Sequence, residues 1–150
     1  MHMNSALVDT NILVYIVDTK EKEKHAKALD WYAAQRKNKT LCISIQNLRE
    51  FAAICVKKTG LGKEKIMQWI EDYSSAFWVL NDSQEDIIKA VETAREKGIP
   101  YYDGLLAATM ERYGLGTIIT ENSKDFKKHG RIDVIDFADL QGNQTDLGRY

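Results

Sequence analysis

The feature that most constrains the fold of this chain is an alternation of short apolar runs with longer segments of helical periodicity. Short apolar runs are typical of buried strands, and they occur at residues 6–8, 41–44, 77–80, 117–120 and 133–135. Strands that alternate with helices are joined by right-handed crossovers and form parallel sheets covered on both faces. The alternation therefore predicts a three-layer α/β/α sandwich around a mainly parallel sheet of roughly five strands.

The segments between the apolar runs are predicted to be helical because apolar residues recur in them at every third or fourth position. Glycine is a common C-terminal end of helices, and Gly60, Gly98 and Gly114 end three of these segments. Together the strands and helices form one predicted domain, residues 1–140, followed by a polar tail at 141–150 without periodicity. The predicted helices cover 12–17, 20–37, 46–58, 63–74, 83–98, 103–113 and 123–128.

The composition excludes several classes of protein. The 150 residues are 44% hydrophobic and 29% charged, which is typical of a globular domain, and the net charge of -1 gives no global attraction to nucleic acid. Cys42 and Cys55 lack the spacing of a zinc site or a disulfide scaffold, so we expect free thiols. No apolar run reaches the ~18 residues of a membrane span, and the first residues do not resemble a signal peptide. A cytoplasmic location is therefore expected.

Polar side chains stand where the predicted strands end. Asp9 directly follows the first strand, and Glu50 lies on the second turn of the helix after the second strand. Asp103 lies in the first turn of an otherwise apolar helix, and the stretch TENSKDF after the fourth strand contributes Asn122 and Asp125. Because ligands of parallel sheets bind beyond the carboxyl ends of the strands, we expect these oxygen atoms to converge at one edge.

Each of these residues also has an ordinary structural interpretation. Asp9 could be a solvated turn residue, and Glu50 could form a surface ion pair with the arginine that precedes it. Asp103 would stabilise a helix dipole, and Asn122 and Asp125 have the spacing of a capping box. Taken together, the ordinary interpretations are weaker, because several acids follow strands that end at the same edge. Converging carboxylates destabilise a fold unless a cation neutralises them.

A site with oxygen ligands and without neighbouring cysteine or histidine suits Mg²⁺ or Mn²⁺ better than zinc. These hard cations retain several water ligands and commonly bind substrate phosphates. The sequence therefore favours phosphoryl or phosphodiester chemistry at the predicted edge of the sheet.

Four segments resemble the PIN-domain family, and within it the VapC-type toxin ribonucleases. They are VDTNILVY at 8–15, NLREF at 47–51, YDGLLAATM at 102–110 and TIITENSKDF at 117–126, and the resemblance extends over roughly residues 6 to 140. It implies a metal-dependent endoribonuclease that hydrolyses RNA phosphodiester bonds, is often a homodimer and is often silenced by a small antitoxin protein. One departure is Gly104, which stands where an alanine is usual.

The resemblance also implies roles for individual residues. Asp9 and Asp103 would hold the Mg²⁺ or Mn²⁺ ion directly, with Glu50 as a further ligand or as the group that positions water. Either Asn122 or Asp125 would complete the catalytic set. Four polar residues would orient the carboxylates or water: Thr10, Asn11, Thr120 and Asn122. Four cations flank the last segment and are predicted to contact the RNA backbone: Lys124, Lys127, Lys128 and Arg131.

Three other functions compete with the nuclease. A dehalogenase-type phosphatase needs a second aspartate two residues after the first, and Asn11 occupies that position. A phosphotransfer receiver domain needs an acceptor aspartate after the middle strand, and Asp82 follows the third predicted strand. A PIN-like module that binds RNA or protein without cutting remains open, although the chain retains the three acids at positions 9, 50 and 103.

Overall fold

The computed structural model describes residues 5–35 and 40–140. Its strands are β1 (Ala6–Val8), β2 (Leu41–Ser44), β3 (Trp78–Leu80), β4 (Thr117–Thr120) and β5 (Asp133–Asp136). Its α-helices are α1 (Thr10–Val17), α2 (Lys22–Gln35), α3 (Ile45–Ile54), α4 (Lys63–Ala76), α5 (Gln84–Lys97), α6 (Tyr101–Arg112) and α7 (Ser123–Lys127). A π-helical turn, η1 (Cys55–Thr59), extends α3, and a 3-10 turn, η2 (Phe137–Asp139), follows β5.

The five strands form one sheet in the order β3-β2-β1-β4-β5, and every neighbouring pair is parallel. The chain starts at the central strand, adds β2 and β3 on one side, and then returns across the sheet to add β4 and β5 on the other. This reversal places a topological switch point between β1 and β4, where parallel sheets commonly hold their ligands. A receiver domain has the order 2-1-3-4-5, so the observed topology rules out that alternative.

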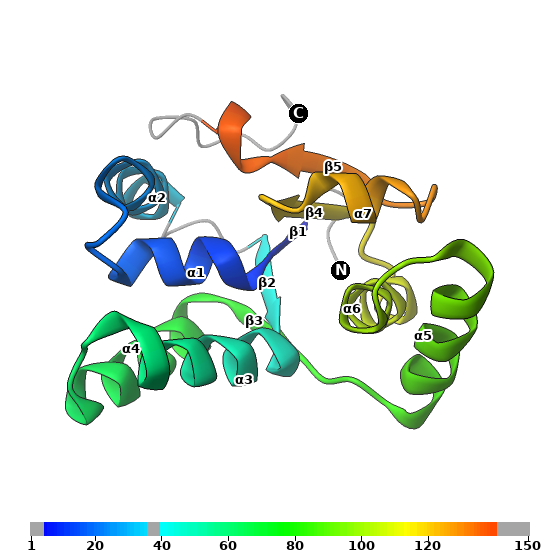
Figure 1. Ribbon diagram of the computed structural model, residues 1–150, viewed down its shortest axis with the longest axis horizontal. Coiled ribbons are helices and arrows are strands. Elements are labelled where there is room, and N and C mark those ends of the chain that lie inside the picture. The colour runs from blue at the N-terminus through cyan, green and yellow to red at the C-terminus, as the bar shows by residue number, and fades with distance from the viewer. Residues whose placement is uncertain (1–4, 36–39, 141–150) are drawn as a thin grey trace.

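Helices cover both faces of the sheet, as the sequence predicts (Figure 1). The alternation of side chains along the strands creates the two packed layers: Ala6 and Val8 join one buried cluster, whereas Leu7 joins the other. The larger cluster lies under α1, α2, α3 and α4, and the smaller one lies under α6 and α7. The predicted three-layer α/β/α sandwich is therefore confirmed.

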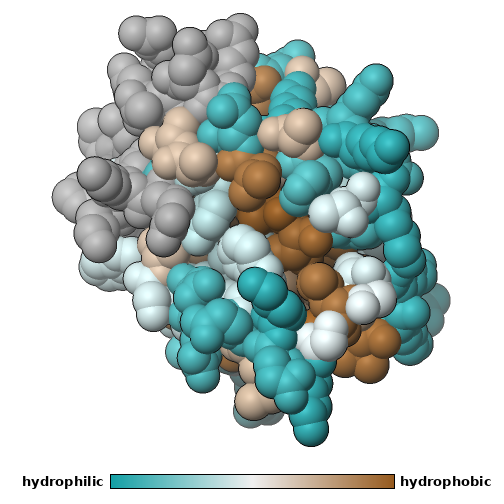
Figure 2. Space-filling view, turned by 90° about the vertical axis from the view of Figure 1, so that its left-hand side faces the viewer, coloured by the Kyte–Doolittle hydropathy of each residue, from teal (hydrophilic) through white to brown (hydrophobic). Residues whose placement is uncertain are grey.

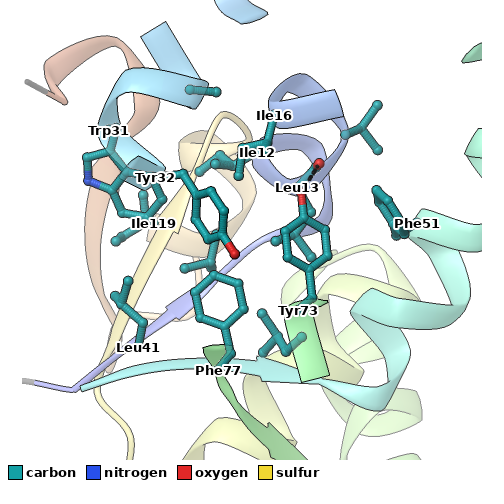
Figure 3. Close-up of a cluster of buried hydrophobic side chains, with 14 of the residues drawn as sticks. Ile12, Leu13, Ile16, Trp31, Tyr32, Leu41, Phe51, Tyr73, Phe77 and Ile119 are labelled. Atoms are coloured by element: carbon teal, nitrogen blue, oxygen red, sulfur yellow. Dashed lines mark hydrogen bonds between the residues drawn. The ribbon is translucent and has the colours of Figure 1, made fainter. Parts of the chain in front are cut away.

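Aromatic side chains fill the larger core, which Figure 3 shows in close-up. Tyr73 of α4 packs edge-on against Phe51 and Tyr32, with ring centroids 5.2 and 5.8 Å away. Its buried hydroxyl donates a hydrogen bond to the backbone oxygen of Leu13 at 2.8 Å, which meets the requirement that buried polar groups find a partner. Burial of each such large side chain stabilises the fold by roughly 1.5–3 kcal/mol, and this core holds α1 rigidly at the end of β1.

Element boundaries differ from the predicted ones where local hydrogen bonds decide them. Helix α1 begins at Thr10 rather than residue 12 because the Asp9 side chain caps it. Strand β3 begins one residue late, since the Phe77 backbone amide still donates to Tyr73 of α4. The segment predicted as one helix to residue 58 changes to the π-helical turn at Cys55 and ends at Gly60, whose φ of 74° is left-handed.

The predicted ends of α5 are confirmed. Ser83 and Asp86 form a capping box, in which each side chain accepts from the other residue's backbone amide, and Gly98 ends the helix with φ of 68°. The predicted tail at 141–150 and the predicted end of the second helix at 36–37 lie outside the described residues. Within the described ranges, no helix combines the length and apolarity that crossing a membrane requires.

Candidate active site

Asp9 is a buried carboxylate at the carboxyl end of the central strand. Only 8% of the residue is exposed, and both of its carboxylate oxygens accept hydrogen bonds. The backbone amide of Thr10 donates to Oδ1 at 2.8 Å, and the hydroxyl of Thr120 at the end of β4 donates to Oδ2 at 2.7 Å. Asp9 thus lies at the switch point between β1 and β4, and its interpretation as a solvated turn residue is wrong.

Glu50 faces the same region from α3. Its Oε1 accepts a hydrogen bond from the hydroxyl of Thr10 at 3.0 Å and a longer one from Nε2 of Gln46 at 3.4 Å. Arg49 instead points away and pairs with Asp82 at 3.3 Å. The alternative of an ion pair between Glu50 and Arg49 is therefore wrong, and Thr10 links Glu50 to Asp9.

Asp103 enters the cluster from the first turn of α6. Pro100 occupies the N-cap position of this helix, so Asp103 is a first-turn residue and not the N-cap. Its Oδ2 accepts a hydrogen bond from Nδ2 of Asn122 at 2.9 Å. The side chain is partly buried, and the contact joins the loop after β4 to the start of α6.

The capping-box interpretation of Asn122 and Asp125 is also wrong. Asn122 precedes α7, but its side chain makes no capping hydrogen bond and binds Asp103 instead. Its backbone amide donates to the hydroxyl oxygen of Thr120 at 2.9 Å. Asp125 lies close enough to raise the pKa of Asp103, and its own carboxylate pairs with Lys128 at 3.5 Å.

The carboxylates repel one another, and this repulsion appears in their proton affinities. Burial, the nearby charges of Asp9 and Asp125, and the more distant Glu50 together raise the pKa of Asp103 to about 6, although the bond from Asn122 opposes the shift. Burial is also the main cause that raises the pKa of Asp9 above its ordinary value. In the described part of the chain, no lysine, arginine or histidine forms a salt bridge with Asp9, Glu50 or Asp103. The cluster therefore holds negative charge that no basic side chain of the described residues balances.

This donor set fits a hard divalent cation. Its ligand atoms would be the carboxylate oxygens of Asp9, Glu50 and Asp103, and no described basic side chain balances their charge, so an added cation would remove the repulsion. The side chains are not already gathered around one point: among residues 5–35 and 40–140, no three acidic, cysteine or histidine side chains form a ready cation site.

The remaining predicted residues lie at different distances from the carboxylates. Asn11 accepts a hydrogen bond from the backbone amide of Glu121 at 3.3 Å, next to Thr120. Lys124 and Lys127 are exposed on α7. Arg131 pairs with Glu111 at 3.1 Å and lies two residues before the start of β5, so it is near the amino ends of the strands, away from the carboxylates at their carboxyl ends.

Two buried amides of the site were not predicted from the sequence. Nδ2 of Asn47 donates to the hydroxyl oxygen of Thr10 at 3.0 Å, and Nε2 of Gln46 donates to the backbone oxygen of Tyr102 at 2.9 Å. A signal was available, because residues three and four positions before Glu50 share its face of the helix.

The comparison with known protein families agrees with this geometry. The family model described as PIN domain matches residues 6–132, which is most of the chain. The protein belongs to the PIN domain family. Members of this family are nucleases that generally use divalent metal ions, so the family supports a hydrolase.

Several solved structures with the same fold are toxins or toxin–antitoxin complexes. The chain is similar to a toxin–antitoxin complex from Klebsiella pneumoniae, with 25% identity over 91% of this chain and 100% of that one and a TM-score of 0.63. DNA-bound VapBC from Salmonella typhimurium is 24% identical over 89% of this chain and 98% of that one, with a TM-score of 0.61. VapC20 from Mycobacterium tuberculosis, a toxin that cleaves the sarcin-ricin loop, is 17% identical over 87% and 98%, with a TM-score of 0.64. None of the curated proteins matches the sequence.

Proposed function

We propose that this protein is a Mg²⁺- or Mn²⁺-dependent endoribonuclease and the toxin of a toxin–antitoxin pair, acting in the cytoplasm. The observation that carries the proposal is the group of Asp9, Glu50 and Asp103 at the switch point of the sheet, which has no basic partner among the described residues. Burial, and after it the charge of neighbouring carboxylates, raises the pKa of Asp9 and of Asp103. A structural cluster of acids would be balanced by basic side chains, as buried charges usually are. The absence of such partners in the described ranges favours an exogenous cation.

Each acid has a distinct task in this proposal. Asp9 and Asp103 would hold the cation directly, and Glu50 would ligate it or orient the attacking water. When bound, the cation would supply Lewis-acid stabilisation of the phosphodiester and an activated water. Thr10, Thr120 and Asn122 fix the carboxylates through the hydrogen bonds described above. Asn11 holds the backbone of the loop after β4, and Asp125 adds negative charge near Asp103.

The RNA backbone would be bound by basic residues near the last acidic segment. Lys124, Lys127 and Lys128 lie on or beside α7 with exposed side chains, and Lys128 also balances Asp125. Arg131, which pairs with Glu111, would contact a part of the RNA further from the carboxylates. Each lysine that neutralises one phosphate makes binding more sensitive to salt, so binding should weaken steeply as the salt concentration rises.

Two protein partners complete the proposal. A small antitoxin protein would occupy the face formed by α1, α2 and α4, where Figure 2 shows a strip of apolar side chains bordered by hydrophilic ones. Two of these helices carry an exposed large apolar residue among the described ones: Leu29 on α2 and Met67 on α4. A second copy of the chain would cover α5, on which Ile87, Ile88 and Val91 share one exposed face. Exposed apolar patches of this kind mark interaction surfaces.

The test is cleavage of a mixed, labelled RNA pool in the presence of Mg²⁺ or Mn²⁺. Asp9→Asn keeps the size of the side chain and removes its charge, and it should abolish metal-dependent cutting. Asp72→Asn is the matched control, because Asp72 is an exposed carboxylate on α4 that accepts a hydrogen bond from Gln68 at 3.0 Å and belongs to none of the elements that deliver the three acids. This control should cut at the wild-type rate, and circular dichroism should show that both variants fold.

Three outcomes would contradict the proposal. Equal cutting by wild type and Asp9→Asn would locate the activity elsewhere. Cutting by wild type in the presence of a chelator would remove the role of the metal. An absence of cutting together with an absence of Mn²⁺ binding by calorimetry would favour the non-catalytic binding module.

A further inference from the structure

The first turn of α3 carries two adjacent side-chain amides, Gln46 and Asn47, that are 5% and 0% exposed. Both ends of the Asn47 side chain have partners. Its Oδ1 accepts from the backbone amide and the hydroxyl of Ser44, and its Nδ2 donates to the hydroxyl of Thr10. The Asn47 backbone amide donates to the Ser44 hydroxyl and completes the capping box of α3. Gln46 has no part in this cap. Its burial therefore needs another explanation.

The Gln46 side chain connects two of the elements that deliver the acids. Its Nε2 donates to the backbone oxygen of Tyr102 at 2.9 Å, and Tyr102 directly precedes Asp103 in α6. The same Nε2 lies 3.4 Å from Oε1 of Glu50, one turn further along α3. One amide group thus bridges the start of α6 and the carboxylate of Glu50.

The oxygen of the Gln46 side-chain amide indicates that this residue does not serve the stability of the fold. Oε1 of Gln46 is buried and has no hydrogen-bond partner among the described residues. A buried acceptor without a partner costs folding free energy, whereas a methionine of the same length would fill the space without that cost. A purely structural position would therefore favour an apolar side chain.

We propose that Gln46 is a positioning residue of the carboxylate site, an inference that rests on the proposed divalent-cation site. The amide holds the first turn of α6 against Glu50, and this fixes Asp103 relative to Glu50. Gln46 touches neither the ion nor the RNA, since its free oxygen is sealed from solvent. Groups that orient metal ligands in this way commonly change metal affinity or activity by about 10–100-fold when they are removed.

The test compares Gln46→Met with the control Thr109→Val, which removes a buried hydroxyl from the far end of α6, the helix whose first turn Gln46 contacts. Gln46→Met should raise the Kd for Mn²⁺ at least about tenfold by calorimetry and lower kcat with an unchanged KM for RNA. Its thermal unfolding midpoint should equal or exceed that of wild type. Thr109→Val should give the opposite pattern, with a lower midpoint and an unchanged Kd.

Hydrogen exchange in the absence of metal provides a readout independent of activity. The Gly104 amide bonds to the Pro100 backbone oxygen at 2.9 Å in the first turn of α6, and it should exchange faster in Gln46→Met. A folded Gln46→Met with wild-type Mn²⁺ affinity would overturn the positioning role alone. Wild-type protein that binds no Mn²⁺ would overturn the cation site and this inference together. If Gln46→Met does not fold, Gln46→Leu serves for the same measurements.

Discussion

Two buried aspartates of this protein lie at helix N-termini and have opposite electrostatic surroundings. Asp86, in the first turn of α5, accepts hydrogen bonds from Arg112, Thr109 and the backbone amide of Ser83. Although burial alone would raise its pKa, the bonds and charge of Arg112 and the other donors lower it below the ordinary value. Asp9, at the start of α1, receives only neutral donors, and its pKa is raised. The first carboxylate stabilises the fold as an anion, whereas the second strains it.

The largest expected effect comes from removing the charge of Asp86, the aspartate whose charge Arg112 balances. Asp86→Asn should lower the free energy of unfolding by about 2–3 kcal/mol, because the new amide places a donor against the guanidinium of Arg112 and leaves buried donors unpaired. Chemical denaturation at pH 7.5 measures this loss. Mn²⁺ affinity should not change, and a variant as stable as wild type would show that Arg112 and Thr109 contribute little through Asp86.

A smaller effect of opposite sign is expected among the acids of the candidate site, where Asp9, Glu50 and Asp103 have no basic partner among the described residues. Asp103→Asn should raise the free energy of unfolding of the metal-free protein at pH 7.5. A pKa near 6 instead of 3.8 corresponds to about 3 kcal/mol at most, and partial exposure of the side chain reduces this to about 1–2 kcal/mol. The same variant should lose Mn²⁺ binding. A destabilised Asp103→Asn protein would contradict the account of repulsion in the cluster.

The two groups should also respond to pH in opposite directions. The pKa of Asp103 is raised in the fold, so its contribution to stability is full below pH 3.8 and is lost as the pH rises to about 6. The pKa of Asp86 is lowered, so its contribution is present above pH 3.8 and is lost as the pH falls through the folded value. Because Asp103 must lose its proton to bind a cation, Mn²⁺ affinity should fall about tenfold between pH 7 and pH 5. Calorimetry in two buffers of different ionisation enthalpy would show proton release at pH 5, and a constant affinity would contradict the role of Asp103.

The smallest effect concerns Gly104, which lies on α6 between Asp103 and Arg112, the partner of Asp86. A Cβ atom at this position would approach the hydroxyl of Thr93 on α5 to 2.8 Å, which is closer than real contacts allow. An alanine at this position would therefore force Thr93 or the packing of α5 against α6 to shift, although alanine is the better helix former by about 1 kcal/mol. Gly104→Ala should destabilise the protein by about 1 kcal/mol in denaturation experiments. In a Thr93→Ala background it should instead stabilise it, and additive effects would contradict the steric explanation.

The sequence allowed prediction of the fold because its signals were local. Alternating apolar and polar periods identify strands and helices, and the Ser83–Asp86 spacing and Gly98 define the ends of α5 before any long-range contact is known. The three acids could be predicted because each lies close to the end of a predicted strand or the start of a predicted helix: Asp9 follows β1, Glu50 is in the second turn of α3, and Asp103 is in the first turn of α6. The contacts of Gln46 could not, because its partner Tyr102 is 56 positions away and a backbone oxygen has no sequence signature. The pairing of Asn122 with Asp103 was missed for the same reason, since the local spacing of a capping box concealed a bond between distant segments.

The residues of the candidate site lie far apart in the sequence, so the site can assemble only after most of the domain has folded. The bond between Thr120 and Asp9 spans 111 positions, and Asn122 reaches back 19 positions to Asp103. Strand β4, which carries Thr120, pairs with the first strand of the chain although it is the fourth to be synthesised. Contacts of such long sequence separation form late in folding. A growing or truncated chain that stops before β4 has acids but no assembled site, so the site reports the completeness of the whole domain.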